Sequence, residues 1–191
     1  MRMKKYSYLA LALFAASCSS NNNQPNAPAT AECGVERWHV KILTDPAVGA
    51  IHWQPVATTI ADQNSFPQIN VSDDTGRMAF EEQAVTVPAT IVAFKREDDQ
   101  DIHLVLVDSF QDSMIAEIPS TSCPEVAASA YAPDYNSAAQ WVTAHLGTPT
   151  SDFKHVNVNA TITGVLFQDF AHGQTGHARN YREVHPVTKI E

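Results

Sequence analysis

The chain has 191 residues and a formal net charge of −9, with 21 acidic against 12 basic side chains. Nucleic-acid binding draws most of its affinity from lysine and arginine contacts with phosphates, so this balance argues against DNA or RNA as a partner. The motifs GxGxxG, GxxxxGK[ST], GxSxG and HExxH do not occur in the sequence, which argues against nucleotide-driven and serine-hydrolase mechanisms.

The first 17 residues have the pattern of an export signal. Three of the first five are basic, and the uncharged apolar run Tyr6–Ala16 follows, just before Ser17 and Cys18. The run is too short to cross a bilayer, which takes about 20 apolar residues. The segment resembles a bacterial lipoprotein signal, and this resemblance implies cleavage after residue 17 and lipidation of Cys18. An ordinary secretory signal cut nearby is the alternative.

The residues after Cys18 form a polar spacer. The segment SSNNNQPNAPAT has almost no large apolar side chain, so we expect a flexible tether over 18–31 and one folded domain over 32–191. Ser19 stands where aspartate would signal inner-membrane retention, so the resemblance implies an outer-membrane anchor, with the domain on the periplasmic or the surface side. Losing the signal removes three basic residues and no acidic one, which moves the formal charge from −9 to −12.

Lipidation of Cys18 leaves Cys33 and Cys123 as a pair. An even number of cysteines in an exported protein favours a disulfide, which would tie the start of the domain to its middle. Two free redox thiols are the alternative, but the CxxC spacing typical of that chemistry is missing.

The first part of the domain gives mixed signals. Trp38, Val40 and Ile42 alternate with polar residues and predict a half-buried strand. A second short apolar stretch, HWQPVATTIAD, begins at His52. Residues 65–77 contain the prolines, aspartates and glycine typical of a loop.

Five strands and one helix are predicted after residue 84. Alternating apolar residues predict strands over residues 85–94, 101–108, 113–118, 155–167 and 181–190. Gly164 predicts a bulge or bend in the fourth of these strands. Apolar residues at helical spacing predict a helix from Tyr135 to Leu146, with Gly147 at its C-terminal cap.

This element order resembles the OB-fold, a small five-stranded barrel with one helix between its third and fourth strands. The resemblance covers about residues 85–191. It implies that apolar side chains of several strands share one interior, among them Ile102, Leu104, Val158 and Ile162. The expected fold class is therefore mainly β, with an OB-fold-like five-stranded barrel and an N-terminal β extension.

Three motifs also suggest a family. The segments REDDQDIHLVL at 96–106, HGQTG at 172–176 and EVHPV at 183–187 resemble the signature of a family of small exported bacterial proteins of unassigned activity. The resemblance implies export and carries no reaction with it.

Potential metal ligands are densest near the C-terminus. His172, His177, Glu183 and His185 offer the imidazole and carboxylate groups that suit zinc. Their spacing matches no established zinc motif. The favoured interpretation is therefore a buried, hydrogen-bonded His185, with Glu183 as its partner or as a partner of Arg182, and no bound metal. In this interpretation His172 is a polar residue that fixes the loop.

Two further groups contain carboxylates. Asp98, Asp99 and Asp101 crowd one turn where oxygen ligands could hold calcium, but the turn lacks the glycine and glutamate of an EF-hand, which favours a solvated acidic turn. Asp101, His103 and Glu117 could align on one face of adjacent strands as a general acid and base, because residues two apart on a strand face the same side. No nucleophile stands beside them, so a hydrolase built there would have to activate water.

From these features we expect a non-enzymatic envelope protein that binds a ligand or a partner protein. OB-folds place ligands over the second and third strands, between the loops that here span 95–101 and 171–180. The expected binding residues are His172, Gln174, His177 and Asn180. The acidic loops favour a cationic, peptidic or saccharide ligand, and no cofactor is expected. The alternative is a metal-dependent hydrolase of phosphodiester or cell-wall substrates, with zinc or calcium as its metal.

Overall fold

The computed structural model describes residues 33–191. The predicted signal, the lipidation site Cys18 and the tether at 18–31 lie outside these residues. Within the described part, no helix is long and apolar enough to span a membrane.

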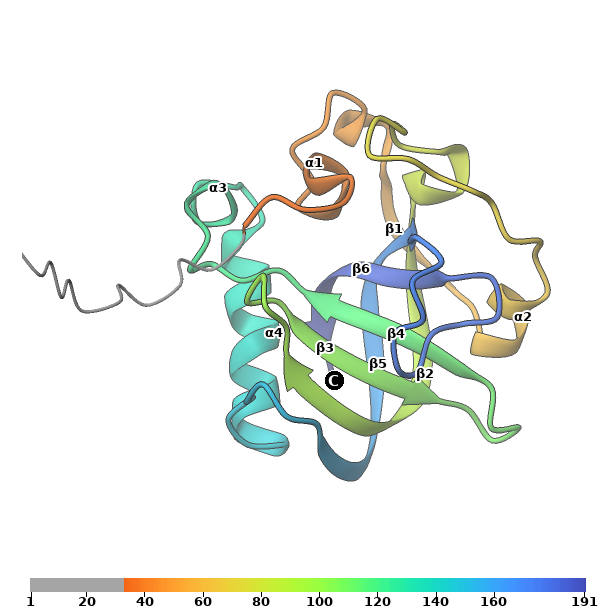
Figure 1. Cartoon of the computed structure of the whole chain (residues 1–191), viewed down its shortest axis with the longest axis vertical. Helices are drawn as coiled ribbons and strands as arrows, with labels where there is room; N and C mark the ends of the chain where they lie inside the picture. The colour runs from red at the N-terminus through yellow and green to blue at the C-terminus, as the bar shows by residue number, and fades with distance from the viewer. Residues whose placement is uncertain (1–32) are drawn as a thin grey trace, which may run out of the picture. The chain divides into compact units, whose positions relative to one another are not determined.

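The described chain is mainly β, as predicted, and its six strands form one mixed sheet (Figure 1). The strands are β1 (His52–Ala57), β2 (Gln83–Arg96), β3 (Ile102–Val107), β4 (Ser113–Ile118), β5 (Lys154–Gln168) and β6 (Arg182–Ile190). Their order is β1-β2-β3-β4-β6-β5, and β5 pairs with β2 as well. The pairings from β2 to β6 therefore form a closed ring, in which β4 and β6 run parallel and the other neighbours run antiparallel.

The helices are short except for one. They are α1 (Trp38–Lys41), α2 (Ile60–Asn64), α3 (Pro124–Ala127) and α4 (Ala132–His145), with single 3₁₀ turns at Val48–Ala50 and Ala79–Glu82. The predicted helix is α4, which contacts β6 and lies beside the sheet (Figure 1). It buries Tyr135, Ala138 and Val142. Gly147 follows it with φ of 101°, the left-handed conformation expected of a glycine cap.

The strand predicted from Trp38 to Ile42 is wrong, because these residues form α1. The N–H of Ile42 donates to the carbonyl of Trp38 at 3.0 Å, which is one helical turn. Both side chains are buried, and residues four apart share a face in a helix just as alternate residues share one in a strand. A five-residue apolar pattern is therefore compatible with either structure.

One hydrophobic core fills the interior of the ring. Leu104 of β3 and Ile162 of β5 both belong to it and are fully buried, as the sequence predicts. Ile102 belongs to the same core, whereas Val158 is only partly buried and lies outside it. The core also contains Phe94 of β2, Met114, Ala116 and Ile118 of β4, and Tyr135 and Val142 of α4.

Gly164 marks an irregularity in β5, as predicted, since its pairing with β6 shifts register on both sides of the glycine. A Cβ atom at this position would lie 2.3 Å from the carbonyl oxygen of Pro186. We therefore expect Gly164→Ala to lower the free energy of unfolding by about 1 to 3 kcal/mol through overpacking, measured by urea denaturation. Gly49→Ala is the control because a Cβ there meets no atom within 4 Å. Equal stability of the two variants would contradict this account.

Strand β1 lies outside the ring and pairs in parallel with the first residues of β2. All six of its residues are exposed. Its register shifts between His52 and Val56, the interval that contains Pro55.

The predicted disulfide is present and joins Cys33 to Cys123, which are 90 positions apart in sequence. Cys123 immediately precedes α3, in the segment that follows β4. The disulfide therefore fixes the beginning of the described chain near the end of β4. Pairing of these cysteines fits export to an oxidising compartment.

Candidate functional site

The candidate site lies on the outer face of β3 and β4. Ile102 and Leu104 contribute to the core, so His103 between them faces the other way. His103 is the cross-strand partner of Glu117 in β4, and its Nδ1 lies 2.9 Å from Glu117 Oε1. Both side chains are buried although they face away from the core.

Glu117 bridges two imidazole rings. Its second oxygen, Oε2, lies 3.2 Å from Nδ1 of His185, which comes from β6 next to β4. The same nitrogen of His185 lies 3.2 Å from Oε1 of Glu183. His185 is thus a buried, hydrogen-bonded histidine with Glu183 as a partner, as the sequence suggests.

Asp101 joins the group through His185. Its Oδ1 accepts a hydrogen bond from the backbone N–H of Ser120 at 2.8 Å, and its Oδ2 lies 3.5 Å from His185 Nε2. Asp101 and His185 are both fully buried. The structure therefore brings together Asp101, His103 and Glu117, the three residues that the sequence suggested as an acid and base group.

The HGQTG loop closes over His103. The carbonyl oxygen of Thr175 lies 3.1 Å from His103 Nε2. Gly176 makes this approach possible, because its φ is 87° and a Cβ there would lie 2.5 Å from a methyl group of Val105. A side chain at this position would push the loop away from β3.

The charges of this buried group stabilise one another. Burial alone would lower the pKa of His103, but hydrogen bonding to Glu117 and Glu97 raises it to about 10. Burial would raise the pKa of Glu117, but His103 and His185 hold it well below its ordinary value. For Glu183, burial and the nearby charges of Asp169 and Glu117 outweigh the effect of His185 and raise the pKa to about 8.

A cavity of about 210 Å³ opens onto Glu117. We call it the acidic pocket, because five carboxylates line it. Its lining residues are Val35, Glu36, Lys41, Glu97, Asp98, Asp99, Glu117, His172 and Gln174. The pocket lies between the two loops expected to hold a ligand, and a segment near Cys33 completes its wall.

Lys41 is the buried cation of the acidic pocket. Its Nζ lies 3.0 Å from Glu36 Oε2, and the side chain is almost wholly buried. Burial would lower the pKa of Lys41, but the charges of Glu117 and Glu183 raise it above its ordinary value. Burial, together with the charges of Asp101 and Glu117, raises the pKa of Asp99 to about 6.

The four residues considered as alternative zinc ligands, His172, His177, Glu183 and His185, do not converge on one point. Nε2 of His172 lies 2.6 Å from Asp169 Oδ2, while His177 stacks on Tyr181 with ring centroids 4.5 Å apart. Glu183 and His185 belong to the buried group around Glu117.

The four predicted binding residues divide into two pairs. His172 and Gln174 line the acidic pocket, whereas His177 and Asn180 do not. The side-chain amide of Asn180 donates to the carbonyl oxygens of Gln63 and Phe66, at 2.7 and 2.9 Å, and the residue is buried. Asn180 therefore anchors the loop to the last turn of α2 and to the residues that follow it.

The aspartates of the 98–101 turn point to different surroundings. Asp98 is exposed, Asp99 accepts a hydrogen bond from the backbone N–H of Asp101, and Asp101 is buried.

Within residues 33–191, three other sets of acidic and histidine side chains could hold a metal ion, because their possible ligand atoms lie within 4.8 Å of one another. They are Glu36, Asp169 and His172; Glu97, His103 and Glu117; and Asp101, Glu117 and His185.

Several residues of the site were not predicted. Glu36 and Lys41 come from the segment after Cys33, and Glu97 from the turn before β3. Asp169 immediately follows β5. For Glu36 and Lys41, the predicted disulfide was the one clue in the sequence. A link from Cys33 to Cys123 brings the segment after Cys33 close to the end of β4, and therefore close to Glu117.

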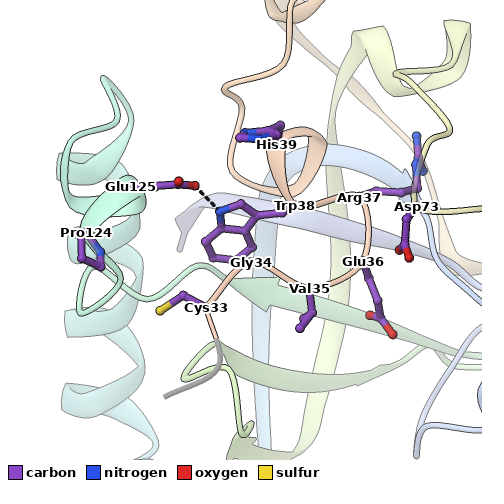
Figure 2. A pocket seen from close by; sticks show the side chains of 10 residues that line it. All are labelled: Cys33, Gly34, Val35, Glu36, Arg37, Trp38, His39, Asp73, Pro124 and Glu125. Atoms are coloured by element: carbon purple, nitrogen blue, oxygen red, sulfur yellow. Dashed lines mark hydrogen bonds between the residues drawn. The ribbon is translucent and has the colours of Figure 1, made fainter. Parts of the chain in front are cut away.

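Two larger cavities offer less chemistry, and the first of them adjoins the acidic pocket, since Val35 and Glu36 line both. Figure 2 shows one of about 940 Å³ around Trp38, whose Nε1 donates to Glu125 Oε2 at 2.6 Å. Arg37, which also lines it, is bound by both oxygens of Glu81 at 2.7 Å. Their polar atoms are thus already paired within the protein. Another cavity, of about 540 Å³, lies over the middle of β2 and β5 beside the exposed Phe110.

Comparison with protein-family models finds no match for the chain, and no curated protein matches it either. The geometry of the acidic pocket and of the buried group beneath it is therefore the basis for assigning a function.

Proposed function

We propose that this chain is an exported, lipid-anchored envelope protein whose OB-like domain binds a cationic group of a peptide in the acidic pocket, without catalysing a reaction. The observation that carries the proposal is the set of five carboxylates lining this pocket. Three of them pair with Lys41, Lys95 or a histidine, whereas Asp98 and Asp99 form no ion pair within residues 33–191. Carboxylates that converge on a partly enclosed space attract and orient an ammonium or guanidinium group.

The strand pairings support an OB-like assignment. The ring has the neighbour order β2-β3-β4-β6-β5, which is the order expected if these five strands correspond to the OB strands. In the chain, α4 follows the third of them and precedes the fourth, as that correspondence requires. OB-folds bind ligands over their second and third strands, which here are β3 and β4. Likeness of fold is an analogy, so the pocket's own chemistry carries the functional argument.

The surroundings of the two histidines favour binding over hydrolysis. A general base must lie within hydrogen-bonding reach of the proton it removes. His103 and His185 are fully buried and face protein atoms at both ring nitrogens. The alternative hydrolase with Asp101, His103 and Glu117 therefore has less support than a binding protein.

A lysine peptide tests the proposal. We expect the blocked tripeptide Ala-Lys-Ala to bind the purified full chain in the presence of chelator, and its Nε-acetylated form to bind far more weakly. Asp98→Asn should weaken binding of the lysine peptide by about two- to fivefold, the value of one solvent-accessible ion pair. Isothermal titration calorimetry measures both effects.

The control is Asp134→Asn, which makes the same change on the exposed face of α4. Binding of both peptides with equal affinity would contradict the proposal. Equal effects of Asp98→Asn and Asp134→Asn would show general electrostatic attraction to an acidic protein instead of a site.

A further inference from the structure

We propose that Glu97, His103 and Glu117 form a site for one divalent transition metal ion, with zinc as the best fit. The site lies at the base of the acidic pocket, which Glu97 and Glu117 line. It does not depend on the proposed peptide ligand, because the metal would be held by side chains of the protein alone.

The hydrogen bonds of His103 leave a place for a cation. Nε2 faces the carbonyl oxygen of Thr175, which can only accept, so this nitrogen carries a hydrogen. Nδ1 faces Glu117 Oε1 at 2.9 Å and Glu97 Oε1 at 3.0 Å. Ionised carboxylates only accept as well, so a bare nitrogen lone pair would repel them. Either a proton or a metal ion must lie among these three atoms.

The distances are close to those of a metal site. Ligands about 2.0 to 2.1 Å from a tetrahedral zinc ion lie roughly 3.3 Å apart. The distances from Nδ1 to the two oxygens are a few tenths of an ångström shorter than this. Glu97 lies in a turn and its side chain is 20 % exposed, so the expansion required is a small movement of a partly exposed side chain.

Each ligand is oriented by a second contact. The backbone carbonyl at Nε2 fixes the His103 ring, an arrangement that commonly supports metal-bound histidines. Glu97 Oε2 pairs with Lys95 Nζ at 2.7 Å, and Glu117 Oε2 faces His185 at 3.2 Å. The acidic pocket leaves room for a water molecule as a fourth ligand.

The donor set selects among metals. One imidazole nitrogen with two carboxylates suits zinc and its neighbours in the first transition row. Calcium prefers six to eight oxygen ligands, which three side chains and a small pocket do not supply. The calcium site considered for the 98–101 turn has no comparable arrangement.

Metal titration of the full chain tests the site. The chain is purified without a polyhistidine tag, stripped with chelator, and titrated with zinc by calorimetry and with cobalt by visible absorption. We expect one zinc ion per chain, and a cobalt spectrum with bands typical of a nitrogen and oxygen ligand set. Glu97→Gln should weaken zinc binding by at least about 10- to 100-fold, the loss typical even for a residue that only supports a metal ligand, and should alter the cobalt bands.

Two control variants make the result decisive. Asp98→Asn removes the same charge from the adjacent position, which is not a ligand of the zinc site. It should change zinc affinity by less than about twofold, below the value of a direct exposed ion pair. His172→Ala removes a possible ligand of the neighbouring set Glu36, Asp169 and His172, and zinc affinity should again stay nearly unchanged. Circular dichroism confirms that each variant is folded.

Three outcomes would overturn the proposal. They are the absence of saturable zinc binding, equal losses in Glu97→Gln and Asp98→Asn, and loss of zinc only in His172→Ala. If no saturable zinc binding is found, His103 Nδ1 carries a proton in place of the metal ion. The two proposals can fail independently, because Asp98→Asn is expected to weaken binding of the lysine peptide and to leave the affinity for zinc nearly unchanged.

Discussion

Glu117→Gln is expected to lower the free energy of unfolding by roughly 3 to 5 kcal/mol, the cost of breaking a buried ion pair. Glu117 bridges His103 and His185 with its two oxygens and is itself almost fully buried. Glutamine keeps the shape but replaces one acceptor oxygen with an NH₂ group. One imidazole would then face a donor, and the positive charges around the site would lose their central partner.

Urea denaturation at pH 7 measures this effect, with chelator present so that metal loss does not contribute. Glu191→Gln is the matched control, because Glu191 pairs with Lys189 where both side chains are about 60 % exposed. Its cost should stay within about 0.5 kcal/mol. If Glu117→Gln is as stable as this control, the buried group contributes nothing to the fold.

Removing the disulfide is expected to cost roughly 4 to 5 kcal/mol, because the Cys33–Cys123 link closes a loop of 90 residues in the unfolded chain. The double variant Cys33→Ala, Cys123→Ala is preferred to serine, since Cys123 is fully buried and a hydroxyl there would have no partner. Urea denaturation of the full chain gives the difference.

Reductant provides the internal control for this measurement. It should destabilise the native chain by about as much as the double substitution does and leave the variant unchanged. A reductant effect that persists in the variant would show that another reaction is responsible. A variant as stable as the native chain would mean that the link adds nothing to stability.

The fold was predictable where long segments have a clear period. β5 alternates over most of its 15 residues, and α4 carries its buried residues at helical spacing before Gly147. The segment at Trp38–Ile42 is too short to distinguish the two periods, and its structure depends on burial against distant strands. Local pattern is insufficient in such segments because tertiary contacts decide between the conformations.

The site was predictable only in part, for a similar reason. His103 and Glu117 lie on adjacent strands with known periodicity, so their meeting follows from the strand pairing. Glu97, Lys41 and Asp169 lie in turns or in the segment after Cys33, where no period fixes the side-chain direction. His172 and His177 are close in sequence, but each contacts a different partner. Proximity in sequence is therefore a poor guide within a glycine-rich loop.

Strand β1 is exposed and lies at the edge of the sheet, where a second copy of the chain could attach. An exposed strand at a sheet edge is a template on which a second chain can add a strand, which leads to aggregation. Pro55 lies in the middle of β1 and has no backbone N–H, and the register of the strand is irregular there. A strand approaching from another copy would find an interrupted row of donors, so this edge is protected against intermolecular strand addition.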